Sequence, residues 1–150
     1  MNKIKTGVYA SLLVLSLLIG SCDLERSKNG NFDGYWHLTS VDTLSTGGRL
    51  DLSNDLIFWA VQLHLLNVVD QGRDSTHLGY LLYFRLSSTR LEVYEPYVNN
   101  KEEGDIKLKD PTPLKPFGIN GLKDKFNIER LDKGYMELAN DSLRLSFRKM

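Results

Sequence analysis

The alternation of apolar and polar residues near the C-terminus is the feature that most restricts how this chain can fold. Every second residue from Leu143 to Phe147 is apolar, so these side chains share one face of a predicted strand. Two shorter apolar runs, 126–131 and 134–138, precede it and are separated from it and from each other by turn residues. The three runs predict an antiparallel meander. Its expected inward side chains are Phe126, Ile128, Met136, Leu138, Leu143, Leu145 and Phe147.

Short apolar runs of the same kind continue upstream, which is typical of an all-β domain. Segments 80–86 and 90–94 flank Ser87-Ser88-Thr89 and predict a hairpin. Segment 57–69 fits either a helix or a strand, and its Trp, Phe and Val content favours one long strand. The residues expected on one side of that strand are Ile57, Trp59, Val61, Leu63 and Leu65.

The strand pattern lapses between residues 96 and 124. This stretch holds a polar run at 99–104 and, after it, Pro111, Pro113 and Pro116, which cannot donate to the interior of a sheet. An irregular segment of this length in a small domain is either a mobile loop or a functional one. Its far end is expected to attach to the core through a short helical turn. The residues expected to make that attachment are Phe117, Ile119 and Leu122.

The N-terminus has the three parts of a secretory signal. Lys3 and Lys5 precede an apolar stretch from 8 to 19, and two small residues then precede Cys22. The apolar stretch is about 12 residues long, whereas a membrane-spanning helix needs roughly 20. Residues 1–21 are therefore predicted to be a signal peptide.

Ile19-Gly20-Ser21-Cys22 resembles the lipobox of bacterial lipoproteins, in which the cysteine is acylated and becomes the new N-terminus. An ordinary signal peptide with an incidental cysteine is the alternative. Cys22 is the single cysteine of the chain, so an exported domain would have no disulfide. The resemblance implies a lipidated Cys22 followed by a flexible linker, together residues 22–32. It also implies a bacterial cell-envelope location, expected at the outer membrane on its periplasmic face or at the cell surface.

Charge excludes one class of partner. Loss of residues 1–21 removes two of the 19 basic residues and leaves 17 against 19 acidic ones, a net charge of −2. No basic excess remains to attract nucleic acid. The remaining chain from Asp33 to Met150, about 118 residues, has the size of one domain.

Gly34-Tyr35-Trp36 opens the first expected strand and resembles the Gly-x-Trp motif of lipocalins and related calycin barrels. In those families the tryptophan closes one end of the barrel and a basic residue of the last strand packs across it. The resemblance implies that Trp36 has this role, with Arg144 or Arg148 as its basic partner. A guanidinium over an indole stabilises by roughly 0.5–2 kcal/mol.

The whole layout resembles the small lipocalin-like lipoprotein domains of unknown function that are common in Bacteroidetes. The segments that carry this resemblance are GYWHLTSVDT, IFWAVQLHLL, FNIERL and MELANDSLRLSFRK. It implies an all-β fold for residues 33–150: a small antiparallel lipocalin-like β-barrel with meander topology. The chain is shorter than a full lipocalin, and seven or eight strands are expected.

No enzymatic chemistry, cofactor or metal site is expected. The chain holds no Gly-rich phosphate loop and no Gly-x-Ser-x-Gly elbow. Its three histidines lack the spacing of a zinc site. Glu102, Glu103 and Asp105 lie in a polar stretch where a solvated charge run is the simpler interpretation. Carboxylates that meet at the barrel mouth would be needed for an enzyme.

A small β-barrel either fills its interior with side chains or encloses a small ligand. We therefore predict an envelope lipoprotein that binds a small apolar or amphipathic ligand. The alternative is a filled barrel that acts as a protein-interaction, accessory or inhibitor module. The aromatic residues that could line a cavity or its mouth are Trp59, Tyr80, Tyr83, Phe84, Tyr94 and Tyr97. Each of them could equally be an ordinary core or sheet-face residue.

Three short motifs resemble the Asp-Ser/Thr-aliphatic acceptor of the Bacteroidetes O-glycosylation system. Their hydroxyl residues are Thr43, Ser75 and Ser142, all expected at strand ends or turns. The alternative is plain turn chemistry, for which Asp-Ser and Asp-Thr are also well suited.

Overall fold

The computed structural model describes residues 26–72 and 79–150. The predictions for the signal peptide, Cys22, Ser75 and His77 lie outside these residues. The strands are β1 (Gly34–Thr43), β2 (Gly48–Asp51), β3 (Ile57–Gln62), β4 (Leu65–Asp70), β5 (Tyr80–Leu86), β6 (Arg90–Val98), β7 (Ile106–Lys107), β8 (Lys123–Leu131), β9 (Tyr135–Ala139) and β10 (Leu143–Lys149). Two 3₁₀ helices accompany them, η1 (Gly30–Phe32) and η2 (Thr112–Phe117).

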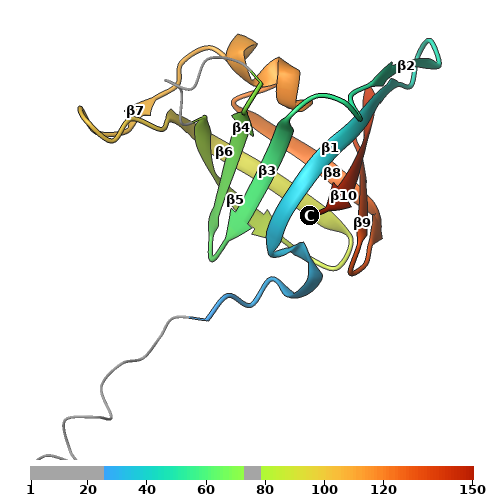
Figure 1. Cartoon of the computed structure of the whole chain (residues 1–150), viewed down its shortest axis with the longest axis horizontal. Helices are drawn as coiled ribbons and strands as arrows, with labels where there is room; N and C mark the ends of the chain where they lie inside the picture. Colours follow the sequence, from blue (N-terminus) through green and yellow to red (C-terminus); the bar gives the residue numbers. More distant parts are fainter. Residues whose placement is uncertain (1–25, 73–78) are drawn as a thin grey trace, which may run out of the picture.

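Eight of these strands form a closed antiparallel barrel (Figure 1). They pair in the order β1-β3-β4-β5-β6-β8-β9-β10, and β10 pairs back to β1 along its length, from Trp36↔Lys149 to Thr43↔Leu143. The short strands β2 and β7 are added to β1 and β6. The prediction of a small lipocalin-like barrel with meander topology is confirmed.

The C-terminal meander also follows the predicted alternation. Leu145 and Phe147 of β10 are buried, and they pair with Leu138 and Met136 of β9, which are buried too. Phe126 of β8 completes this side of the core. The other predicted inward residues, Ile128 and Leu143, are half-buried and pack against the core.

Segment 57–69 differs from its prediction as one long strand. It is a hairpin in which β3 and β4 pair from Ile57↔Asp70 to Gln62↔Leu65. The turn at Leu63 and His64 reverses the chain, so Leu66 and Val68 face inward while Leu65 lies on the other face. Leu63 has a φ of 55°, a conformation that leucine rarely adopts. Because a leucine occupies this position instead of a usual turn residue, the sequence did not indicate the turn.

Side chains fill the barrel interior. Trp59 lies at its centre, with ring centroids 4.9 Å from Phe147 and 6.1 Å from Phe126. Among the described residues, the core begins at Phe32 and ends at Phe147. Within the described part of the chain, no helix has the length and apolar character needed to cross a bilayer.

Both ends of the barrel are covered. At one end η1 places Phe32 inside, with its ring 5.2 Å from that of Phe84. At the opposite end η2 and the residues after it insert Leu114, Phe117 and Ile119 (Figure 1). These two ends are named below the η1 end and the η2 end.

Candidate functional site

Trp36 closes the η1 end of the barrel. Its indole is fully buried, and its Nε1 donates a hydrogen bond to the carbonyl of Phe32 at 2.8 Å. The Nζ atom of Lys149 lies 4.8 Å from the indole centroid and donates to the carbonyl of Asn31 at 2.9 Å. A cation therefore covers the ring, and it comes from the last strand.

This geometry corrects the prediction of Arg144 or Arg148 as the basic partner of Trp36. Inward positions of β10 are odd-numbered, so the inward face continues from Phe147 to Lys149. Arg144 lies on the outer face, where its Nε donates to Glu129 at 2.8 Å, and Arg148 is exposed. Extending the two-residue alternation by one step, from Phe147 to the next inward position, would have identified Lys149 from the sequence.

The glycine of the Gly-x-Trp motif makes room for this cation. Gly34 has a φ of 122°, and a Cβ placed on it would lie 2.7 Å from Cε of Lys149. A larger residue would therefore push the lysine stem away from the indole. The motif and the last strand thus form one structural unit.

Segment 96–124 closes the η2 end. The carbonyl of Phe117 accepts a hydrogen bond from Trp59 Nε1 at 3.2 Å, and its ring lies 6.0 Å from that of Tyr80. The predicted helical turn and the attachment through Phe117 and Ile119 are confirmed, whereas Leu122 is only half-buried. Sequence reasoning missed the buried Leu114, because the prolines on both sides of it suggested an exposed loop.

The predicted ligand-lining residues separate into two groups. Trp59 and Phe84 are core residues, and half-buried Tyr80 packs against Phe117. Three tyrosines, on β5 and β6, lie instead on the outer face. They are Tyr83, Tyr94 and Tyr97.

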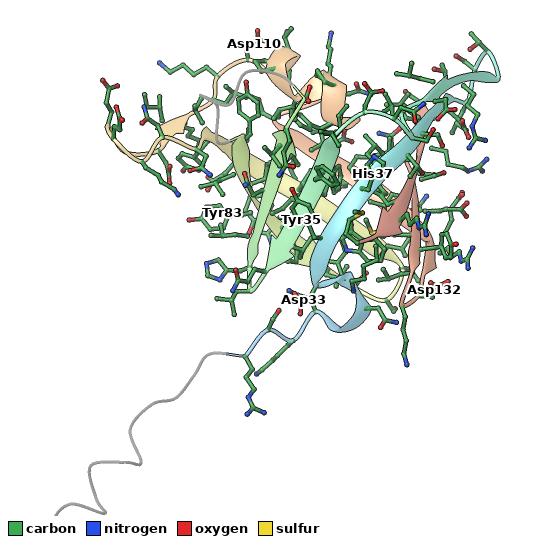
Figure 2. The ribbon with its side chains drawn as sticks, viewed as in Figure 1. Asp33, Tyr35, His37, Tyr83, Asp110 and Asp132 are labelled. Atoms are coloured by element: carbon green, nitrogen blue, oxygen red, sulfur yellow. The ribbon has the colours of Figure 1, made fainter. Side chains whose placement is uncertain are left out.

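These tyrosines form one outer surface with Leu65 and Leu81, here named the aromatic wall. Figure 2 labels Tyr83, which lies on this surface. The ring of Tyr83 is stacked on Tyr94 at 6.1 Å and meets the edge of Tyr97 at 6.4 Å. All five side chains are half-buried. The wall crosses the outside of β4, β5 and β6.

Two cations cover outer rings of the aromatic wall. Arg85 lies 4.6 Å from the Tyr94 centroid, and Lys107 lies 5.9 Å from that of Tyr97. The hydrogen bond that Lys107 donates to Glu95 raises the pKa of Lys107, so its ammonium stays charged. Arg85 also pairs with Glu92 at 3.6 Å and Lys107 with Glu95 at 3.1 Å. The wall is therefore apolar at its centre and bordered by ion pairs on the β6 side.

Two hollows lie along this wall and share Leu65 and Leu81. One, of about 230 Å³, lies beside Tyr83, Tyr97 and Asp105. The other, of about 640 Å³, extends over the outside of β3 and β4 to β1. Its further lining residues are Gly34, Tyr35, Ala60, Val61, Gln62, Leu63 and Asn67.

Tyr35 forms the far side of the larger hollow (Figure 2). Its ring is stacked on Phe58 at 4.7 Å, and its hydroxyl accepts a hydrogen bond from Gln71 at 2.7 Å. Partial burial raises the pKa of the phenol, and the hydrogen bond from Gln71 offsets part of this effect. The hydroxyl is therefore neutral at physiological pH.

The described residues hold no group of three or more histidine, cysteine, aspartate or glutamate side chains that could bind a metal ion. Two of the predicted acceptor hydroxyls fall within the described chain: Thr43 is half-buried at the end of β1, and Ser142 is exposed in the turn before β10. Their glycosylation stays a prediction.

Two crystal structures have folds similar to this one. A lipocalin-like protein from Bacteroides uniformis aligns with a TM-score of 0.61 and 18% identity over 81% of this chain and 100% of its own. An uncharacterized protein from Bacteroides eggerthii aligns with a TM-score of 0.59 and 16% identity over 79% and 98% of the two chains. No curated protein matches the chain significantly. Residues 15–150 match the model of the Lipocalin-like domain family. With its closed meander barrel and its tryptophan-plugged end, the chain belongs to the Lipocalin-like domain family.

Proposed function

We propose that this protein is a lipid-anchored lipoprotein of the bacterial cell envelope that binds a partner through the outside of a filled barrel. The packed interior carries this proposal. Trp36 and Trp59 occupy the space in which a carrier would hold its ligand, and residues around η1 and η2 cover both ends. Interiors packed in this way leave few voids larger than a water molecule.

The anchor part of the proposal rests on the N-terminal sequence. Lys3, Lys5 and the apolar stretch before Cys22 match a lipoprotein signal. The intact mass of protein purified from its own envelope should therefore exceed that of residues 22–150 by the mass of the acyl groups. A Cys22→Ser variant should lose this mass. An unmodified mass in the wild type would remove the anchor from the proposal.

The aromatic wall supports the choice of a binding surface. Tyrosine and arginine are enriched at protein interfaces, where rigid aromatic rings give contact area at low entropic cost. Tyr83, Tyr94 and Tyr97 are held by neighbouring strands and by each other, so little side-chain freedom remains to be lost on binding. We therefore place the partner on the outside of β4, β5 and β6.

The two hollows on the same wall favour a second candidate function. An apolar hollow of about 640 Å³ falls in the range of small-molecule sites, and its neighbour adds about 230 Å³. A small amphipathic ligand would then bind outside the barrel, between Tyr35 and Tyr97. This candidate keeps the predicted ligand class but moves the ligand from the interior to the wall.

Photo-crosslinking tests directly whether the partner binds at the aromatic wall. A photo-crosslinking amino acid replaces Tyr97 in protein expressed in its native envelope. The matched control carries the same group at Ser146, on the outer face of β10 across the barrel. We expect one discrete crosslinked protein from position 97 and none from 146, and a Leu81→Ser variant should abolish it. Equal crosslinking from both positions would contradict a partner on the wall.

Native mass spectrometry separates the two candidates. A reproducible small-molecule adduct, lost on denaturation and absent from a Leu81→Ser variant, would establish the second candidate. An adduct that this variant retains, but that a Phe117→Ala variant loses, would place a ligand inside the barrel. That result would overturn the filled-barrel proposal.

A further inference from the structure

Side-chain charge is divided unequally between the two ends of the barrel. The η1 end consists of residues 26–36, 61–66, 85–92, 129–137 and 147–150, the segments that meet at the strand ends next to η1. They hold eight lysines and arginines against five aspartates and glutamates, a net side-chain charge of +3.

The η2 end has the opposite sign. It consists of residues 41–58, 69–72, 79–80, 95–124 and 138–144, which hold seven basic against eleven acidic residues, a net charge of −4. The described chain as a whole is neutral, with 16 of each kind. The fold therefore separates charges that the composition shows as balanced.

Most cations of the η1 end are available to a partner. Two form ion pairs, Arg130 with Asp132 at 2.7 Å and Arg85 with Glu92 at 3.6 Å. Five others are exposed and form no ion pair with any described residue. They are Arg26, Lys28, Arg90, Lys133 and Arg148. Unpaired surface charges of one sign produce a potential that acts over roughly a Debye length, about 8 Å in physiological salt.

Exposed apolar groups lie among these cations. Tyr135 is 49% exposed beside Arg130, and Met150 is 74% exposed at the end of the chain. Half-buried Leu63 lies at the β3–β4 turn of the same end. Basic side chains mixed with tyrosine and aliphatic groups are the composition that suits the interface of a bilayer.

The path of the N-terminal segment directs this end toward the proposed anchor. Ser27 and Asn29 donate to the carboxylate of Asp33 at 2.6 and 2.7 Å, and Asn29 also donates to the carbonyl of Leu63 at 2.6 Å. Residues 27–32, the second half of the predicted linker, are thus fastened to the barrel. The first part of that linker, residues 22–25, lies outside the described residues. Three residues lie between Cys22 and Arg26, and the four residue-to-residue steps can span at most about 14 Å.

We propose that the η1 end is a docking surface for anionic phospholipid headgroups. The barrel then stands on the bilayer with its basic end toward the lipid and its acidic η2 end away from it. The aromatic wall remains accessible at the side. The upright orientation rests on the proposed anchor at Cys22, whereas affinity for anionic headgroups rests on the charge of the η1 end alone.

Vesicle sedimentation tests the surface without the anchor. The protein is the chain from Asp23 onward, which contains the core from Phe32 to Phe147. The probes are vesicles of phosphatidylcholine alone and of phosphatidylcholine mixed with phosphatidylglycerol. We expect binding to the mixed vesicles only, and its loss in high salt.

A matched pair of variants assigns the binding to one end. Lys28→Gln, Lys133→Gln and Arg148→Gln together should weaken partitioning by about fivefold per cation, on the order of a hundredfold in all. The control, Lys101→Gln, Lys109→Gln and Lys115→Gln, changes net charge equally at the η2 end and should bind at least as well as wild type. All six residues are exposed, and equal melting temperatures would verify that both variants fold.

Three outcomes would overturn the proposal: no binding to the mixed vesicles, equal binding to neutral vesicles, or equal loss in the two triple variants. If the protein did not bind the mixed vesicles but bound an acidic protein or polysaccharide, the basic end would be assigned to that partner instead. The mass of the native N-terminus is a separate readout. Vesicle binding without acylation would keep the docking surface and discard the anchor, and acylation without vesicle binding would do the reverse.

Discussion

At the scale of single residues, the closure of the η1 end depends on Gly34, Trp36 and Lys149. These residues come from the first and the last strand of the barrel. Lys149 extends past Gly34 and places its ammonium group over the Trp36 indole. The ammonium group also donates to the carbonyl of Asn31, which ties η1 to the last strand. One lysine thus joins the N-terminal and C-terminal segments that close the barrel.

Replacing the ammonium group should weaken this closure. Lys149→Met keeps a long stem but removes the charge and the hydrogen bond, so the free energy of unfolding should fall by about 1 kcal/mol. Arg148→Met, on the exposed side of the same strand, is the matched control and should change stability by less than about 0.5 kcal/mol. Urea unfolding followed by tryptophan fluorescence measures both. Equal effects of the two substitutions would argue against the cation over Trp36.

The turn between β8 and β9 gives stability a component that depends on pH. Asp132 accepts hydrogen bonds from the backbone N–H groups of Gly134 and Tyr135, and these bonds lower the pKa of its carboxyl below the ordinary value (Figure 2). A depressed folded-state pKa stabilises the protein above the unfolded-state value, and this contribution is lost as the pH falls through the folded-state pKa. The window therefore lies below about pH 5.

Asp132→Asn should accordingly lower stability at neutral pH and reduce the decline of stability below about pH 5. The comparison is the free energy of unfolding from urea titrations of both proteins at a series of pH values. Asp141, in the next turn along the chain, is exposed, so Asp141→Asn serves as the control. Parallel pH curves for wild type and Asp132→Asn would show that the carboxylate does not contribute.

At the scale of elements, η2 converts an irregular segment into the cover of a barrel end. Three prolines exclude this stretch from the sheet interior, yet two of them lie within the 3₁₀ helix, where their fixed φ is compatible with the turn. Gly118 then takes a φ of 79° and lets the chain pass close to Leu145. The element is short, and it depends on the core beneath it.

Removing the main contact of this element should open the η2 end. Phe117→Ala deletes a buried ring and leaves a cavity above Trp59, which should cost about 3–5 kcal/mol. Lys115→Ala alters an exposed residue of the same helix and should cost little. Thermal unfolding followed by circular dichroism compares them. A loss below about 1 kcal/mol for Phe117→Ala would mean that η2 does not hold the end closed.

At the scale of the whole molecule, one continuous core reaches both ends of the barrel. It includes Phe32 and Trp36 at the η1 end, Trp59 at the centre and Phe117 at the η2 end. Pairing of β1 with β10 closes the sheet, so the first and last strands of the barrel support each other. Neither end has a separate core that could remain folded alone.

This architecture predicts a single cooperative unfolding transition. Tryptophan fluorescence reports the two buried indoles and far-ultraviolet circular dichroism reports the strands, so the two urea-unfolding curves should coincide. A fluorescence change that precedes the loss of strand signal would contradict this prediction. It would mean that an end of the barrel opens before the sheet unfolds.

Much of the fold could be predicted from residue patterns alone. Alternation identified β10 and the inward faces of β8 and β9, because a side-chain period of two leaves no choice about which residues share a face. The Gly-x-Trp motif located the plugged end. The hairpin of β3 and β4 could not be predicted, because Leu63 occupies a turn position with none of the usual turn residues.

The candidate site depended on information that no local pattern contains. Sequence reasoning placed Tyr83, Tyr94 and Tyr97 among six aromatics that could line a cavity. Whether they face the inside or the outside of a barrel follows from strand register and bulges. The opposite charge of the two ends could not be predicted either. Acidic and basic residues are balanced in the sequence, and successive turns lie at opposite ends of the barrel only once the meander has formed. The sequence by itself determined most of the strands and the inward faces of the C-terminal meander, since these follow from short-range periodicity and turn spacing. The tertiary structure alone decided that the interior is filled, that Lys149 covers Trp36 and that the two ends carry opposite charge, because these features join residues far apart in the chain.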